Sequence, residues 1–95
     1  MWIRSQNRMQ LQDVNRFVIE QFETGIYIVG NGCTLGIYST KEKALKVLDE
    51  IQDAIEDTDY YRIDNIGHGT YALGKGVQVY QMPQDDEVEV WRKKN

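Results

Sequence analysis

The sequence predicts an α+β fold in which one amphipathic helix packs on one face of an antiparallel sheet of about five strands. Three observations support this prediction. Apolar and polar residues alternate before Ser39, a single long helical pattern follows, and a last strand-like run ends at the only proline. The expected order along the chain is β-β-β-β-α-β-β. The 95 residues suit one domain, which we expect to span residues 1–95.

The first strand is predicted at "MWIRSQ", where Trp2 and Arg4 alternate with Ile3 and Ser5. The next stretch, "NRMQLQD", is polar and predicts a turn. The run "VNRFVIEQF" then predicts a second strand.

A hairpin is predicted in "GIYIVGNGCTLGIYS", because two β-rich runs, residues 26–29 and 33–38, flank the dipeptide Asn31-Gly32. Asparagine and glycine tolerate the positive φ angles that a two-residue hairpin turn requires. Gly36 lies inside the second run and indicates a bulge or a close backbone approach.

One helix is predicted over residues 40–57, in "STKEKALKVLDEIQDAIED". Ser39 and Glu42 have the spacing of a capping box. Acidic residues around Asp57 would face the negative end of the helix dipole, so we expect the helix to fray there. The apolar stripe at helical spacing consists of Ala44, Leu48, Ile51 and Ile55, widened by Leu45, Val47 and Ala54.

After the helix, "DYYRIDN" is a strand candidate, residues 66–76 form a glycine-rich hairpin loop, and "VQVYQMP" predicts a last strand that ends at Pro83. Residues 84–95 are read as a charged C-terminal tail. The loop contains "GTYALGKG", which differs by one residue from the phosphate-loop pattern. Gly76 replaces the Ser or Thr that binds magnesium, and a strand pattern follows instead of a helix, so we favour a turn. His68 and Lys75 remain candidates to close over a ligand.

Charge and composition exclude several classes of protein. The 15 acidic and 11 basic residues give a net charge of −4, whereas duplex nucleic acid binding usually needs a basic surface, so we expect no such partner. No apolar run approaches the ~18 residues of a membrane span, and the N-terminus lacks a signal-peptide core, so we expect a cytoplasmic protein without membrane contact. Cys33 and His68 are the only residues of their types, so we expect no metal site and no cofactor.

Two groups of residues are candidates for binding. Trp2, Arg4 and Arg16 could form a cationic and aromatic patch that stacks a base and holds a phosphate. Charge that only protects an edge strand is the alternative. Tyr60 and Tyr61 are adjacent, so one of them would face outward on a strand and, with Trp91, favour self-association.

The blocks "MWIRSQ", "LGIYSTKEKALKVLDEIQ" and "VYQMPQDDEVE" resemble a family of short uncharacterised proteins of Gram-positive bacteria and their phages. Its members share a start like "MWIRSQ", a block like "LGxYxTxExALxVLDEIQ" and an ending like "VYQMP". The resemblance implies a cytoplasmic protein encoded by a genome or a mobile element. It assigns no activity and no functional residue.

We therefore expect a non-catalytic, phage-linked binding protein that sequesters a small anionic ligand, such as a signalling nucleotide. The alternative is an inhibitor or adaptor that acts on a host protein through its acidic helix face and tail. A hydrolase is disfavoured, because no nucleophile, base and orienting group can be assembled from these residue types.

Overall fold

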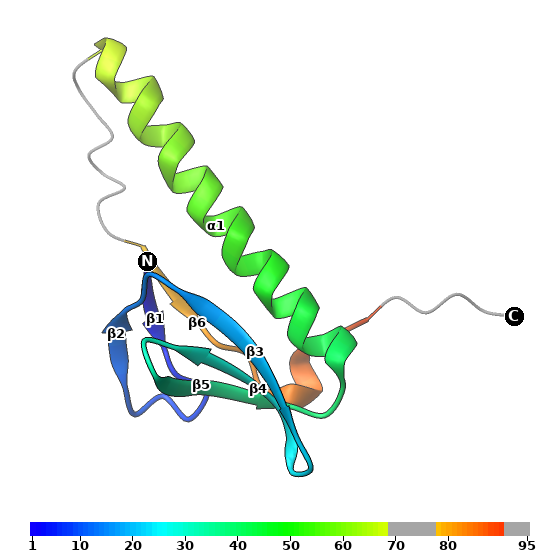
Figure 1. Ribbon diagram of the computed structural model, residues 1–95. Coiled ribbons are helices and arrows are strands. Elements are labelled where there is room, and N and C mark those ends of the chain that lie inside the picture. Colours follow the sequence, from blue (N-terminus) through cyan, green and yellow to red (C-terminus); the bar gives the residue numbers. More distant parts are fainter. Residues whose placement is uncertain (69–77, 91–95) are drawn as a thin grey trace, which may run out of the picture.

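The strands of the protein form two three-stranded sheets rather than the single sheet expected. The computed structural model describes residues 1–68 and 78–90, with the backbone alone for residues 57–68. In this part of the chain the α+β class is confirmed (Figure 1). One sheet has the order β2-β1-β6, with β2 at Leu11–Asp13, β1 at Trp2–Arg4 and β6 at Val79–Gln81. The other has the order β3-β4-β5, with β3 at Phe17–Phe22, β4 at Gly25–Gly30 and β5 at Cys33–Tyr38.

The β2-β1-β6 sheet corrects two predictions. Strand β2 occupies part of the stretch read as a polar turn, where Gln12 pairs with the buried Ile3. Strand β6 pairs with β1 in parallel, so the strands are not all antiparallel. Parallel neighbours need a long crossover connection, and here β2 to α1 provide it.

The predicted β4–β5 hairpin is confirmed. Asn31 and Gly32 form its turn with φ angles of 50° and 82°. A bulge follows, because Ile28 pairs with Gly36 while the next residue, Val29, pairs with Thr34. The Tyr38 ring folds over Gly36, where a Cβ atom would lie 2.9 Å from the Tyr38 hydroxyl oxygen. The bulge predicted at Gly36 is therefore found next to it, at Leu35, whereas the group that approaches Gly36 is the Tyr38 side chain and not a backbone segment.

The helix α1 spans Lys41–His68 and is 28 residues long, so the predicted end near Asp57 is wrong. The strand candidate "DYYRIDN" and the first three residues of the predicted loop 66–76 are helical. The acids around Asp57 lie well inside α1, whereas the dipole penalty acts only within the last turn. Figure 1 shows the C-terminal half of α1 extending beyond both sheets.

The helix is capped by Thr40 and not by the predicted capping box at Ser39. The Lys43 N–H donates to Thr40 Oγ1 at 3.2 Å, which satisfies one of the free amides of the first turn. Ser39 is instead engaged by Asp85, whose Oδ1 atom accepts from the Ser39 N–H at 2.8 Å and from its hydroxyl at 3.1 Å.

The core lies between the inner faces of the two sheets and the first four turns of α1. Strands β3, β4 and β5 all contact α1. Burial of each large aliphatic side chain here stabilises the fold by about 1.5–3 kcal/mol. The buried apolar residues are Ile3, Val14, Ile28, Leu35, Tyr38, Ala44, Val47, Ile51, Met82 and Val88.

Candidate functional site

The outer face of the β2-β1-β6 sheet carries exposed apolar side chains. Trp2, Leu11 and Val79 are 37%, 55% and 53% exposed. Trp2 lies opposite Val79 in β6, and Arg4 lies opposite Leu11 in β2. Directly opposed residues, and residues two apart on a strand, share a face of the sheet. We call this surface the β1 face; it consists of Trp2, Arg4, Leu11, Asp13, Val79 and Gln81.

The charge of the β1 face comes from Arg4. Asp13 is occupied, because its Oδ1 atom accepts from the Met1 ammonium group at 3.0 Å. Arg4 Nε donates to the Arg8 carbonyl oxygen at 3.1 Å. The other guanidinium nitrogens of Arg4 form no hydrogen bond within residues 1–68 and 78–90, so they can bind an anion or a carboxylate.

Arg16, the third member of the predicted patch, belongs to the other sheet. It precedes β3 and lines a shallow pocket of about 390 Å³ on the outer face of β3 and β4. Val18 and Val29, which are directly opposed, contribute apolar side chains to this pocket. Glu20 also lines it, together with Asn31 and Gly32 of the hairpin turn. The structure therefore places Trp2 and Arg4 on one face and Arg16 on another.

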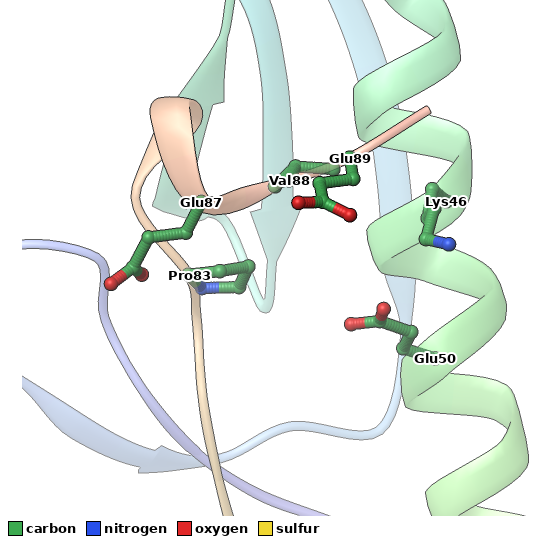
Figure 2. A pocket seen from close by; sticks show the side chains of 6 residues that line it. All are labelled: Lys46, Glu50, Pro83, Glu87, Val88 and Glu89. Atoms are coloured by element: carbon green, nitrogen blue, oxygen red, sulfur yellow. The ribbon is translucent and has the colours of Figure 1, made fainter. Parts of the chain in front are cut away.

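A second pocket, of about 230 Å³, lies between α1 and the C-terminal segment, residues 82–90. Figure 2 shows Glu50 and Glu89 directed into this space, with Pro83 on the far side from the helix. Lys46, Glu87 and Val88 also line the pocket. Three carboxylates against one ammonium group make this pocket unsuited to an anion.

The acidic character of this pocket affects two neighbouring tyrosines. The Tyr80 hydroxyl donates to Glu50 Oε1 at 2.8 Å, and the Tyr38 hydroxyl donates to the Pro83 carbonyl oxygen at 2.8 Å. Burial raises the pKa of Tyr38, and the charges of Asp85, Glu50 and Glu87 add to the effect. Burial and the hydrogen bond to Glu50 raise the pKa of Tyr80. Both hydroxyls therefore stay protonated and act as donors rather than as bases.

The remaining predicted site residues lie either on α1 or outside the described residues. His68 is the last residue of α1, and Tyr60 and Tyr61 lie in its C-terminal half, so the expectation based on a strand does not hold for them. Lys75 and Trp91 lie outside the described residues. Sequence reasoning missed Leu11 and Val79. Leu11 stands in a polar stretch, and it becomes part of an apolar face only through pairing with β1.

Neither metal binding nor membrane spanning finds support in the described residues. No group of three or more His, Cys, Asp or Glu side chains in residues 1–68 and 78–90 is placed to hold a metal ion. The described helix is not both long and apolar enough to cross a membrane. Cys33 is an exposed free thiol.

A family model described as Domain of unknown function (DUF7336) matches residues 23–73. The matched residues include β4, β5 and α1, whereas β1, β2, β3 and β6 lie outside the match. No curated protein and no solved structure matches the chain.

Proposed function

Because the chain belongs to DUF7336, a family of unknown function, we propose its function from its surface: it is a non-catalytic binding protein that docks a protein partner on the β1 face. The observation that carries this proposal is the exposure of Trp2, Leu11 and Val79 on one side of the β2-β1-β6 sheet. Contiguous exposed apolar side chains on a small domain mark interaction sites.

The shape and composition of the β1 face favour a protein over a small molecule. Small-molecule sites are concave, and neither of the two pockets above is lined by residues of the β1 face. Tryptophan and arginine carry much of the binding energy in protein interfaces, and Trp2 and Arg4 lie two residues apart on the same face.

A small anionic ligand, such as a signalling nucleotide, is the second candidate. The observation that favours it is again the pair Trp2 and Arg4, since an aromatic ring can stack a base while a guanidinium group holds a phosphate. A cytoplasmic location and a link to phages or mobile elements belong to this proposal as well, and the resemblance of the three sequence blocks supports them.

The proposal is tested by comparing the proteins retained by three immobilised chains. Trp2→Ala removes the centre of the β1 face, and Phe22→Ala is its matched control, because Phe22 is 54% exposed on the other sheet. We expect a specific partner on the wild-type and Phe22→Ala chains, and its loss on Trp2→Ala, with unchanged circular dichroism. The same set of proteins on all three chains contradicts the proposal.

Two further results would assign a different ligand or a different binding surface. A ligand mass in native mass spectrometry that Arg4→Glu abolishes would identify a small anion as the ligand. A partner that Trp2→Ala still binds, but that high salt or neutralisation of Asp49, Asp53 and Glu56 removes, would place the site on the acidic face of α1 instead.

A further inference from the structure

Strand β3 leaves one edge of its sheet uncovered. It is the outer strand of the β3-β4-β5 sheet and is six residues long. Within residues 1–68 and 78–90, no hydrogen bond reaches the edge of β3 that faces away from β4. Successive residues of a strand direct their N–H and C=O groups to alternate sides, so half of the β3 backbone groups point away from β4.

The opposite edge of the same sheet is covered. The Gln6 N–H donates to the Leu35 carbonyl oxygen at 2.8 Å, and Gln6 Oε1 accepts from the Ile37 N–H at 2.9 Å. Among the described residues, the chain therefore protects β5 with its own groups but not β3. An uncovered strand of this length is a template for pairing with another strand.

The outer-face side chains along β3 would complement those of a second, antiparallel copy of the same strand. On the outer face, Val18 is 37% exposed and lies between Arg16 and Glu20. Neither Arg16 nor Glu20 forms an ion pair within the described residues. A partner strand that pairs with β3 would match all three side chains if it placed an acidic residue opposite Arg16, an apolar residue opposite Val18 and a basic residue opposite Glu20.

We propose that two copies of this chain dimerise by antiparallel pairing of their β3 strands across a two-fold axis at Val18. In this register Val18 lies opposite the partner's Val18, and Arg16 lies opposite the partner's Glu20. By symmetry, Glu20 lies opposite the partner's Arg16. On the inner face, Phe17 lies opposite the partner's Ile19. A two-fold interface uses the same patch on both copies, so each contact occurs twice.

Alternative registers are disfavoured by the same residues. A slip of one residue would place inner-face side chains opposite outer-face side chains. A two-fold axis normal to the sheet keeps each side chain on its own face, so it does not allow this register. Moving the axis to Ile19 places Val18 opposite the partner's Glu20, and moving it to Glu20 places two carboxylates in direct opposition. Charge therefore selects the register centred on Val18.

Dimerisation would join the two shallow pockets that Arg16 lines. Val18 and Val29 of each copy would form one continuous apolar surface across the axis, with an arginine–glutamate pair on either side. This interface is separate from the β1 face, because the two lie on different sheets. Failure of one proposal therefore leaves the other standing.

Sedimentation equilibrium tests the dimer through a charge swap. We expect the wild-type chain to sediment at twice its 11.1 kDa mass. Arg16→Glu places a carboxylate opposite the partner's Glu20 at each end of the pairing. We therefore expect the dissociation constant of its dimer to rise at least about tenfold. The double variant Arg16→Glu/Glu20→Arg should restore the dimer. Arg8→Glu carries the same charge change in the turn between β1 and β2, away from β3, and should leave the dimer unchanged.

Cross-linking supplies a second readout. In a Cys33→Ser background, Val18→Cys should give a disulfide-linked dimer on mild oxidation, whereas Phe22→Cys on the same strand should not. A wild-type chain that stays monomeric at all concentrations would overturn the proposal. So would a dimer that persists in Arg16→Glu, or one that Trp2→Ala dissociates.

Discussion

Tyr38 connects strand β5 to the C-terminal segment. Its side chain is 1% exposed and folds over Gly36, so its ring is fixed against its own strand. Its hydroxyl donates to the carbonyl oxygen of Pro83 in the C-terminal segment. Burial is the main reason that its pKa is raised, so the folded state holds the neutral phenol.

Tyr38→Phe should lower the free energy of unfolding by about 0.5–1.5 kcal/mol at neutral pH, because one hydrogen bond is lost while Gln6 Nε2 still donates to Pro83. Urea unfolding measures this, with Tyr27→Phe as the control, because the Tyr27 hydroxyl forms its hydrogen bond with Thr24 at the exposed surface. A raised folded-state pKa contributes stability below the unfolded value of about 10 that is lost as pH rises. The advantage of wild type over Tyr38→Phe should therefore shrink above pH 10. An equal loss in both variants contradicts this account.

At the scale of elements, the C-terminal segment is attached to the start of α1. Asp85 accepts from the Ser39 N–H and hydroxyl, and Lys43 Nζ lies 3.4 Å from Asp85 Oδ2. The Lys43 ammonium group also donates to the Asp85 carbonyl oxygen at 3.0 Å. The Ser39 backbone hydrogen bond is the main reason that the pKa of Asp85 is lowered. The contacts of Asp85 thus depend on its ionised form.

Asp85→Asn should lower the free energy of unfolding by about 0.5–1 kcal/mol at pH 7, a small value because the carboxylate is partly exposed. A lowered folded-state pKa contributes stability that is present above the unfolded value of 3.8 and is lost as pH falls through the folded value. The difference between wild type and Asp85→Asn should therefore vanish in acid. Urea titrations from pH 7 to pH 2 measure it, and the exposed neighbour Asp86→Asn is the control. A difference independent of pH would count against the role of the charge.

Local signals in the sequence predicted the elements that depend on local chemistry. The β4–β5 hairpin follows from Asn31-Gly32, and the helical stripe follows from residues such as Ala44 and Ile51. Capping was misplaced by one residue because Asp85, far along the chain, engages Ser39 and leaves the cap to Thr40. The end of α1 was misplaced because acids were treated as a helix terminus although they lie in its interior.

At the scale of the whole molecule, the three sequence blocks meet through Gln6. Its side chain bonds to Ile37 as a neighbouring strand would, accepting from the N–H and donating to the carbonyl oxygen at 3.1 Å. The Gln6 carbonyl oxygen accepts from Gln84 Nε2 at 2.6 Å. Gln6 thus joins the end of β1 to β5 and to the C-terminal segment, which connects the two sheets.

The candidate site could be predicted only in part, because it also depends on this global arrangement. Trp2 and Arg4 share a face through simple strand alternation, which the sequence shows. Leu11 and Val79 join them only because β2 and β6 flank β1, and the parallel crossover that places β6 there has no local signature. Arg16 was grouped with Trp2 because one sheet was assumed where two exist.

The connection through Gln6 predicts a loss of stability that is specific to its side chain. Gln6→Ala leaves the Ile37 N–H and C=O without their partners and should lower the free energy of unfolding by about 1–2 kcal/mol. Gln12→Ala is the matched control, because within the described part of the chain the Gln12 side chain donates only to Gln10, at 3.3 Å. Hydrogen exchange adds a local readout: the Ile37 amide should exchange faster in Gln6→Ala but not in Gln12→Ala.

Gln6→Glu keeps the acceptor for the Ile37 amide but turns a carboxylate oxygen toward the carbonyls of Ile37 and Pro83, so it should destabilise at least as much as alanine. Equal stability of the three variants would mean that the sheets are held together by apolar packing alone.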